Sequence, residues 1–285
     1  MVVFADKSRE AELIEIWKQS FGDSEEYIRM FFAWNLAKTM VIVYEVDGKA
    51  VSVAYLLPVT YERAGQKAVP CWYLYAAATL PQYRGRGYFG EIMKVVREHI
   101  AEPVLLVPGE ASLVSYYEKQ GMRLWLKEQQ FDSCYNAESV SAYYKHKSFS
   151  QGSIKDLTAA EYAGKREKAL AGTSYIKWDE HFMNYICHEN KVCGGAQKVV
   201  TFEDREYIVM YRIEGDMLKL LEILPQDICL MQQSLLDKRK LEACVQLLLR
   251  ENGCKKAGVC LNPTVMVTDK LDICENQGYF NLTMG

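Results

Sequence analysis

Apolar residues recur with two different periods in the first part of the chain. Over residues 8–20 and 24–37 they return every three to four positions, as on a helix with one buried face. Residues 40–46 and 50–57 are short runs rich in Val, Ile and Tyr, joined by an Asp-Gly pair that supplies the positive φ of a tight turn. The pattern predicts two helices followed by a β-hairpin.

A strand-loop-helix-strand unit follows the hairpin. Residues 69–79 predict one long apolar strand, and the elements expected after it are a helix at 88–100, a strand at 103–107, a short helix at 111–120 and a last hairpin at 122–135. Helices, antiparallel strands and one central parallel pair in this order indicate a mixed α/β (α+β) sheet flanked by helices.

The second part of the chain repeats features of the first. Segments 46–55 and 118–122 have weak counterparts at 203–212 and 275–279, at one common offset. The elements expected between these counterparts are a strand at 217–224, a long helix at 234–252 and a strand at 258–262. A tandem repeat of one fold explains this order best, and two unrelated α/β halves are the open alternative.

The length of the chain agrees with two domains, because 285 residues exceed a typical domain and are few for three. Residues 138–153 contain Tyr, Lys, Ser and Gly without periodicity, which is typical of a linker. We therefore expect a first domain over 1–137, a linker over 138–153 and a second domain over 154–285.

Charge and hydropathy exclude several classes of protein. A net charge of -3 and no long run of like charges argue against nucleic acid as a partner. The first residues lack the pattern of a signal peptide, and the longest apolar stretch, 71–80, is too short to cross a membrane. We expect a soluble cytoplasmic protein, and the sequence leaves a homodimer open.

The cysteines predict neither disulfides nor a metal site. Nine cysteines occur without any C-x-x-C pair, and several lie in apolar runs, so reduced and buried thiols are expected. The His and Cys residues between 181 and 193 do not follow the spacing of a zinc site.

A Gly-rich loop, Gln-Tyr-Arg-Gly-Arg-Gly at 82–87, lies between the predicted strand and helix. Such a loop exposes backbone N–H groups at a helix N-terminus, where the helix dipole favours an anionic phosphate. Gly85 and Gly87 let the backbone approach the ligand closely, and Arg84 and Arg86 add positive charge. The loop lacks the Lys and Ser/Thr of a Walker loop and the acidic ribose-binding residue of a dinucleotide fold.

Residues 79–90, Thr-Leu-Pro-Gln-Tyr-Arg-Gly-Arg-Gly-Tyr-Phe-Gly, resemble the signature Q/R-x-x-G-x-G/A of the GNAT superfamily of acyl-CoA-dependent N-acyltransferases. The resemblance implies two tandem GNAT-like domains, each with a mostly antiparallel sheet and a short splayed parallel pair. It also implies that acetyl-CoA is the co-substrate. Its pantetheine arm would pair with the backbone of Ala77, Ala78 and Thr79. The amides expected to hold its pyrophosphate are those of Arg84, Gly85, Arg86, Gly87, Tyr88, Phe89 and Gly90.

A second feature of the resemblance is a tyrosine on the helix near residue 117. Residues 115–122, Ser-Tyr-Tyr-Glu-Lys-Gln-Gly-Met, look like the Y-E-K-x-G-F ending of the family, and Tyr117 matches its tyrosine. The resemblance implies that Tyr117 protonates the leaving thiolate. The sequence leaves open that Tyr117 is only a core aromatic or that Tyr116 is the inward residue.

Other parts of the site are less defined. Glu45, Glu110 and Tyr75 are all within plausible reach as a general base, and none is singled out. Many members of the family have an Asn where this chain has Pro108, which donates no backbone hydrogen bond.

The acceptor and the second domain are predicted only in outline. Tyr27, Phe31 and Trp34 lie where the family walls its acceptor pocket, although an aromatic stripe of this spacing is more often core. In the second half the matching loop, 226–233, has no glycine and carries an Asp, so it cannot form the same phosphate site. That half is expected to be a degenerate GNAT-like repeat, with one active site per chain.

The leading hypothesis is an acetyl-CoA-dependent N-acetyltransferase that acts on a primary amine of a small molecule or peptide. The alternative is a catalytically silent module that binds acyl-CoA as a sensor or scaffold. An aminoacyl transferase that uses charged tRNA is disfavoured, because it needs no phosphate loop and would require a basic face.

Overall fold

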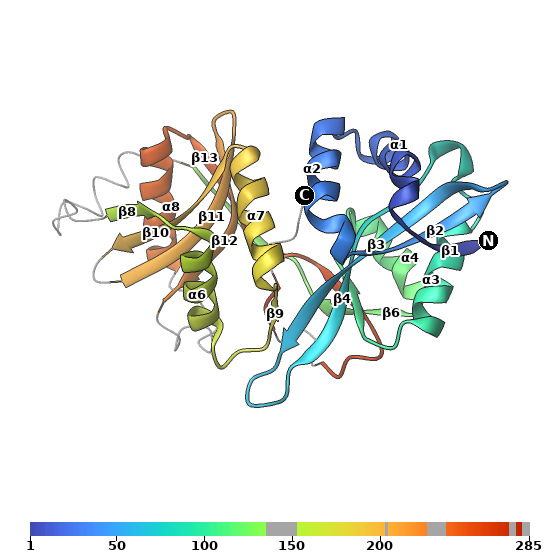
Figure 1. The fold of residues 1–285 in the computed structure, drawn as a ribbon. Helices are drawn as coiled ribbons and strands as arrows, with labels where there is room; N and C mark the ends of the chain where they lie inside the picture. The colour runs from blue at the N-terminus through green and yellow to red at the C-terminus, as the bar shows by residue number, and fades with distance from the viewer. Residues whose placement is uncertain (135–152, 203–204, 227–237, 274–277, 281–285) are drawn as a thin grey trace. The chain divides into compact units, whose positions relative to one another are not determined.

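The computed structural model describes residues 1–134, 153–202, 205–226, 238–273 and 278–280 (Figure 1). The chain forms two compact units that are not continuous in sequence. Unit 1 contains Met1–Tyr61, Ala68–Lys127 and Thr264–Gln277, and unit 2 contains Glu62–Lys67, Glu128–Pro263 and Gly278–Gly285.

Unit 1 is a mixed sheet between two layers of helices. Its helices are α1 (Glu10–Phe21), α2 (Glu25–Asn35), α3 (Tyr88–His99) and α4 (Val114–Lys119). Its strands are β1 (Val2–Ala5), β2 (Met40–Val46), β3 (Lys49–Glu62), β4 (Val69–Thr79), β5 (Val104–Leu106), β6 (Met122–Leu126) and β14 (Val265–Thr268). The strand order is β1-β2-β3-β4-β5-β14-β6, and only β4 and β5 are parallel neighbours.

The two faces of this sheet bury different side chains. Ala54 and Leu56 of β3 pack in a cluster with Ile92 and Val96 of α3. Tyr55 lies between them in sequence, and its ring lies 5.4 Å from that of Trp17 in α1. Because successive residues of a strand point to opposite faces, α3 covers one face and α1 the other.

Most elements of the first half are where the sequence predicts them. The turn between β2 and β3 has positive φ at Asp47 (51°) and Gly48 (77°), as the Asp-Gly pair requires. The two N-terminal helices, the long strand and the helix after the loop are confirmed within a few residues. The edge strand β1 has no counterpart in the sequence analysis, because four residues are too few to establish a period.

Unit 2 repeats the same topology. Its helices are α6 (Ala159–Leu170), α7 (Glu180–Val192) and α8 (Lys238–Asn252). Its strands are β7 (Gln129–Cys134), β8 (Ser153–Asp156), β9 (Tyr175–Lys177), β10 (Gly195–Phe202), β11 (Arg205–Glu214), β12 (Met217–Pro225) and β13 (Lys256–Asn262). The sheet order β8-β10-β11-β12-β13-β7 matches β1-β2-β3-β4-β5-β14 of unit 1, and β12 and β13 are again parallel.

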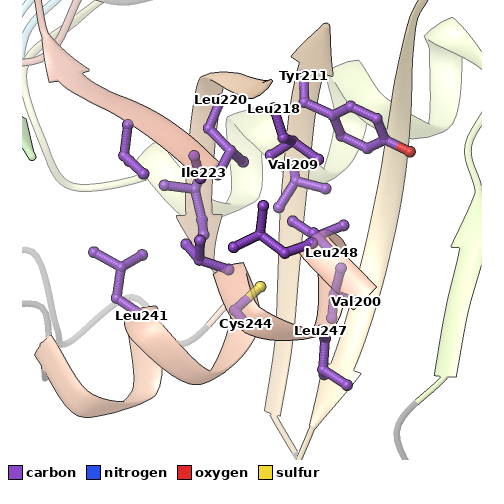
Figure 2. Close-up of a cluster of buried hydrophobic side chains, with 14 of the residues drawn as sticks. Val200, Val209, Tyr211, Leu218, Leu220, Ile223, Leu241, Cys244, Leu247 and Leu248 are labelled. Carbon is purple, nitrogen blue, oxygen red and sulfur yellow. The ribbon is translucent and has the colours of Figure 1, made fainter. Parts of the chain in front are cut away.

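The core of unit 2 lies between α8 and the sheet. Figure 2 shows Leu241, Cys244 and Leu248 of α8 directed at strand residues that include Val209 and Leu220. All of these side chains are at most 3% exposed. The second half therefore has a full apolar core of its own, as a repeated domain needs.

The predicted hairpin at 122–135 is wrong. Its first strand is β6 of unit 1, but its second is β7, which pairs with β13 in unit 2. The place beside β6 is taken by β14, which comes from the other end of the chain. A period-2 pattern identifies a strand but not its partner, so the sequence predicts pairing with the nearest strand.

The expected domain boundaries also differ from the two units in one respect. The sequence predicts two contiguous domains, whereas unit 1 takes β14 from beyond the main segment of unit 2, and β7, which lies within the expected first domain, belongs to unit 2. The expected linker, 138–153, lies outside the described residues except for Ser153, the first residue of β8.

Among the described residues, no helix is long and apolar enough to cross a membrane. In the same residues, no group of His, Cys, Asp or Glu side chains gathers as metal ligands do. Within this part of the chain Cys71, Cys187, Cys244 and Cys254 are free thiols.

Candidate active site

A bulge distorts β4 in the middle of the sheet of unit 1. Val53 pairs with Ala78 and Tyr55 pairs with Tyr75, so one residue of β3 faces two residues of β4. Ala76 within this bulge has φ of 46°. A residue with a Cβ is strained there by about 1–2 kcal/mol, and such strain often accompanies functional sites.

Beyond the bulge, β4 separates from β5. The two strands pair only at Trp72 and Tyr73. The Trp72 N–H donates to Pro103 on the β5 side, whereas the Leu80 N–H donates to Val51 of β3 at 2.9 Å. These two residues are an even number of positions apart and would face the same way in a regular strand. The bulge has therefore reversed the alternation of the backbone N–H directions along β4.

The reversal directs the backbone of Thr79 toward the open edge. Leu80 faces β3, and the Ala78 carbonyl accepts a 3.0 Å hydrogen bond from the Ser52 hydroxyl of β3. Thr79 lies between them, so its N–H and C=O point away from β3. Backbone groups at an unpaired strand edge can bind an extended amide-containing ligand as an added strand.

The Gly-rich loop connects this open edge to α3. Gly85 and Gly87 have φ of 74° and 80°, which favours glycine, and an added Cβ at either would meet no atom within 4 Å. Gly87 is the N-cap of α3, which begins at Tyr88. The first N–H groups of α3, which have no partner within the helix, therefore lie next to this loop, an arrangement that suits a phosphate group.

The side chains of the loop have distinct positions. The exposed Arg84 donates from Nε to the Thr79 carbonyl at 3.0 Å. The exposed Arg86 has its guanidinium carbon 5.4 Å from the centre of the Tyr83 ring. Tyr88 stacks on Tyr44 of β2, with ring centres 4.4 Å apart.

Phe89 and Gly90 face inward. Phe89 packs against the apolar cluster below α3, and its ring centre lies 6.4 Å from that of Tyr116. A Cβ at Gly90 would lie 3.7 Å from the Gln120 amide oxygen, an ordinary contact. Space alone does not require glycine at this position.

Tyr117 is buried in the same cluster, with 7% of its surface exposed. Burial raises its pKa to about 12, and the charge of the neighbouring Tyr116 contributes. Tyr116 is only half-buried, and its ring lies 5.4 Å from that of Tyr117. Tyr117 is thus the more buried of the pair and a phenol that stays protonated at neutral pH.

Tyr73 is a buried phenol that no motif in the sequence marks. It is the last residue of β4 paired with β5, and it is 3% exposed. Burial raises its pKa, and the charge of Tyr117 raises it further. Two phenols therefore interact where the strands begin to separate. In the sequence, Tyr73 lies in an apolar run and cannot be distinguished from the other residues of the strand.

The three candidates for a base differ in their surroundings. Glu45 forms an ion pair with Arg9. Glu110 is exposed and accepts a 3.1 Å hydrogen bond from the Ser112 hydroxyl. Tyr75 directly precedes the bulge and is half-buried. Of the three, only Tyr75 belongs to the separating strand.

The aromatic stripe of α2 is divided between core and surface. Phe31 is 0% exposed and packs 5.4 Å from the Tyr75 ring, whereas Trp34 is 37% exposed. Tyr27 is half-buried. Phe31 is therefore a core residue, and Trp34 is a surface residue of the helix.

Unit 2 has a bulge and a separating strand in the equivalent place. Met210 pairs with Glu222 and Tyr211 with Leu220, and β12 pairs with β13 only as far as Leu220. Leu-Pro-Gln follows the bulge in both units, at 80–82 and 224–226. The loop at 227–233 lies outside the described residues.

The residue after the bulge differs between the units. Glu222 stands where unit 1 has Ala78, and it is 0% exposed. Its carboxylate accepts hydrogen bonds from the Tyr162 hydroxyl (2.6 Å), the Tyr279 hydroxyl (2.9 Å) and Arg166 Nε (3.0 Å). A buried ion pair therefore fills this position in unit 2.

Part of the chain matches a family of known proteins. Residues 3–125 match a family model described as an acetyltransferase (GNAT) domain. No curated protein sequence matches the chain. Among solved structures, a conserved protein from Enterococcus faecalis V583 described as a probable N-acyltransferase is 15% identical, with a TM-score of 0.66 over 94% of this chain and 71% of that one.

Two further structures extend the likeness over nearly the whole chain. N-myristoyltransferase from Saccharomyces cerevisiae with bound myristoyl-CoA is 10% identical, with a TM-score of 0.56 over 98% of this chain and 84% of that one. A tandem GNAT protein from the clavulanic acid biosynthesis pathway is 8% identical, with a TM-score of 0.52 over 96% of this chain and 99% of that one. At these identities the structures agree in fold.

Proposed function

We propose, for a chain whose residues 3–125 belong to the GNAT acetyltransferase family, that unit 1 transfers an acetyl group from acetyl-CoA to a primary amine of a small molecule or peptide. The observation that carries the proposal is the open edge of β4 next to the glycine loop of α3. The edge suits the amide groups of a pantetheine arm, and the loop suits a pyrophosphate.

The reaction assigns a task to each part of this site. A neutral amine attacks the thioester carbonyl, an oxyanion forms, and its collapse breaks the C–S bond and releases a thiolate. A backbone N–H near Ala78 or Thr79 stabilises the oxyanion. Tyr117 donates its proton to the thiolate, and the ammonium of the tetrahedral adduct loses a proton to water or to a base.

The environment of Tyr117 supports its role as the acid. Its pKa is raised to about 12 by burial, so the phenol carries its proton throughout the physiological range. Because the phenolate of Tyr117 is a stronger base than a free thiolate, whose thiol has a pKa of about 8.5, the sulfur takes the proton as the C–S bond breaks and not afterwards. Tyr116, which is less buried, is the natural comparison residue.

Unit 2 is proposed to take no part in the chemistry. In unit 1 this position holds the small apolar side chain of Ala78, whereas Glu222 brings a buried carboxylate and its partners to the equivalent place. A thioester there would displace a satisfied ion pair, which is costly in a buried site. One active site per chain follows.

Binding and turnover test the proposal separately. Acetyl-CoA should raise the melting temperature of the chain, and a panel of primary amines should release free thiol from acetyl-CoA in its presence. No thermal shift with acetyl-CoA contradicts the cofactor assignment. A thermal shift without thiol release from any amine favours the silent sensor or scaffold instead.

A further inference from the structure

Arg84 occupies the part of β4 that the proposed donor needs. Its Nε donates to the Thr79 carbonyl at 3.0 Å, and that carbonyl points to the open edge of the strand. An extended pantetheine arm that pairs with β4 requires an acceptor at the same edge. A carbonyl oxygen has two lone pairs, but the guanidinium and the arm both approach from the side away from β3.

Arg84 has a better partner once a nucleotide is bound. It lies in the loop that leads to Gly87 and the N-terminus of α3, where a pyrophosphate is proposed to bind. A guanidinium binds phosphate through charge-assisted hydrogen bonds, which are stronger than its bond to a neutral carbonyl. Because Arg84 is exposed, its side chain can turn from one partner to the other without disturbing the core.

We infer that the Arg84–Thr79 hydrogen bond is a latch that makes unit 1 select nucleotide-bearing CoA thioesters over thioesters that lack phosphates. A CoA donor releases the latch, because its phosphates attract Arg84 and free the Thr79 carbonyl for the arm. A donor that has the pantetheine arm but no phosphates must break the Arg84–Thr79 hydrogen bond without giving Arg84 a new partner. This inference rests on the proposed function and names the class of donor that it selects.

Arg86 provides the matched control. It is two positions away on the same loop and equally charged, but its guanidinium lies over the Tyr83 ring and not on the edge of β4. Removing Arg86 takes away the same positive charge without freeing Thr79. A purely electrostatic role of the loop arginines would therefore affect both positions alike.

The test compares CoA with pantetheine, which lacks all phosphates, by calorimetric titration of the wild type, Arg84→Ala and Arg86→Ala under reducing conditions. Arg84→Ala should weaken CoA binding by about threefold or more, since charge-assisted bonds are lost. The same substitution should tighten pantetheine binding by about two- to tenfold, the effect of one competing hydrogen bond. Arg86→Ala should weaken CoA binding and leave pantetheine binding unchanged.

The opposite changes in affinity for CoA and for pantetheine distinguish the latch from simpler roles of Arg84. If Arg84→Ala leaves pantetheine binding unchanged, undetectable or weaker, Arg84 is only a phosphate ligand or a support of the loop, and the inference is wrong. Arg84→Met, whose longer side chain supports the loop without donating, should reproduce the gain for pantetheine. If the wild type binds no CoA, the proposed function fails as well. If the wild type binds CoA but Arg84→Ala does not change the affinities for CoA and pantetheine in opposite directions, only the latch is overturned.

Discussion

Glu222 of β12 holds the strand position that Ala78 holds in β4. Each is paired with the equivalent residue of the neighbouring strand, Met210 or Val53, just after a bulge. The two units thus share a backbone geometry and differ in one decisive side chain. In unit 1 this residue is a small apolar alanine, and in unit 2 it is a buried carboxylate bonded to Arg166 at 3.0 Å.

Glu222→Gln should destabilise the protein strongly. Arg166 is 1% exposed and would lose its counterion in the interior, a loss that typically costs about 3–5 kcal/mol. Urea denaturation followed by tryptophan fluorescence should show a lower midpoint. The double variant Arg166→Met, Glu222→Leu should recover much of the loss, and a single variant as stable as the wild type would contradict the role of this pair.

Ala76→Gly should be neutral or stabilising by up to about 1 kcal/mol. Glycine relieves the strain of a Cβ at φ of 46°, and this gain exceeds the entropic cost of glycine. The neighbouring Ala77→Gly is the control, because Ala77 has no positive φ. Glycine there relieves no strain, and its conformational entropy lowers the stability by about 0.5–1 kcal/mol. Equal losses for both variants in the free energy of unfolding would contradict a strained bulge.

Gly87→Asp should weaken acetyl-CoA binding strongly, whereas Gly87→Asn should retain it in part. Asn and Asp have the same shape, and both tolerate the positive φ of this position better than other residues. Only Asp places a negative charge at the N-terminus of α3, beside the proposed pyrophosphate. Titration should give a dissociation constant at least about tenfold higher for Asp than for Asn. Equal affinities for the two variants would contradict the binding of a phosphate at this end of the helix.

Tyr117→Phe should lower kcat by about 10²–10⁴-fold with little change in acetyl-CoA affinity, because it removes only the proton donor. Tyr116→Phe should have a much smaller effect. Since the pKa of Tyr117 is about 12, its proton is lost only as the pH rises through that value. The rate of thiol release should therefore show no alkaline decline below about pH 10. A fully active Tyr117→Phe variant would exclude this acid.

Met266→Pro should disrupt unit 1 although it lies in the C-terminal part of the chain. Met266 is 0% exposed in β14, between β5 and β6, and proline removes a hydrogen bond from a central strand. Acetyl-CoA binding should be lost together with the thermal stability of the chain. Asp269→Pro, one residue beyond the strand, is the control. Binding that survives Met266→Pro would mean that β14 is dispensable for the site.

Local features of the site could be predicted from the sequence because they are encoded by neighbouring residues. The period of 69–79 and the change to a helical period at 88 mark the strand and helix, and the glycines between them mark the turn. Such signals need no knowledge of distant segments. The positive φ of Gly85 and Gly87 agrees with a glycine turn at this place.

Only the tertiary structure decided features that depend on distant partners. The left-handed Ala76 carries no mark in sequence, since nothing in an alanine indicates that its strand must bulge against β3. Likewise, no residue near Glu222 in sequence indicates that Tyr162 and Tyr279 donate to its carboxylate from remote segments.

The choice of β14 over β7 beside β6 has the same origin. A strand's alternating pattern is local, but its partner is set by the whole sheet, which neighbouring residues do not encode. The sequence by itself therefore determined most elements of the first half and the glycine loop, and it indicated the repeat. The fold alone decided which strand closes each sheet, where β4 opens, and that the equivalent place in unit 2 is filled.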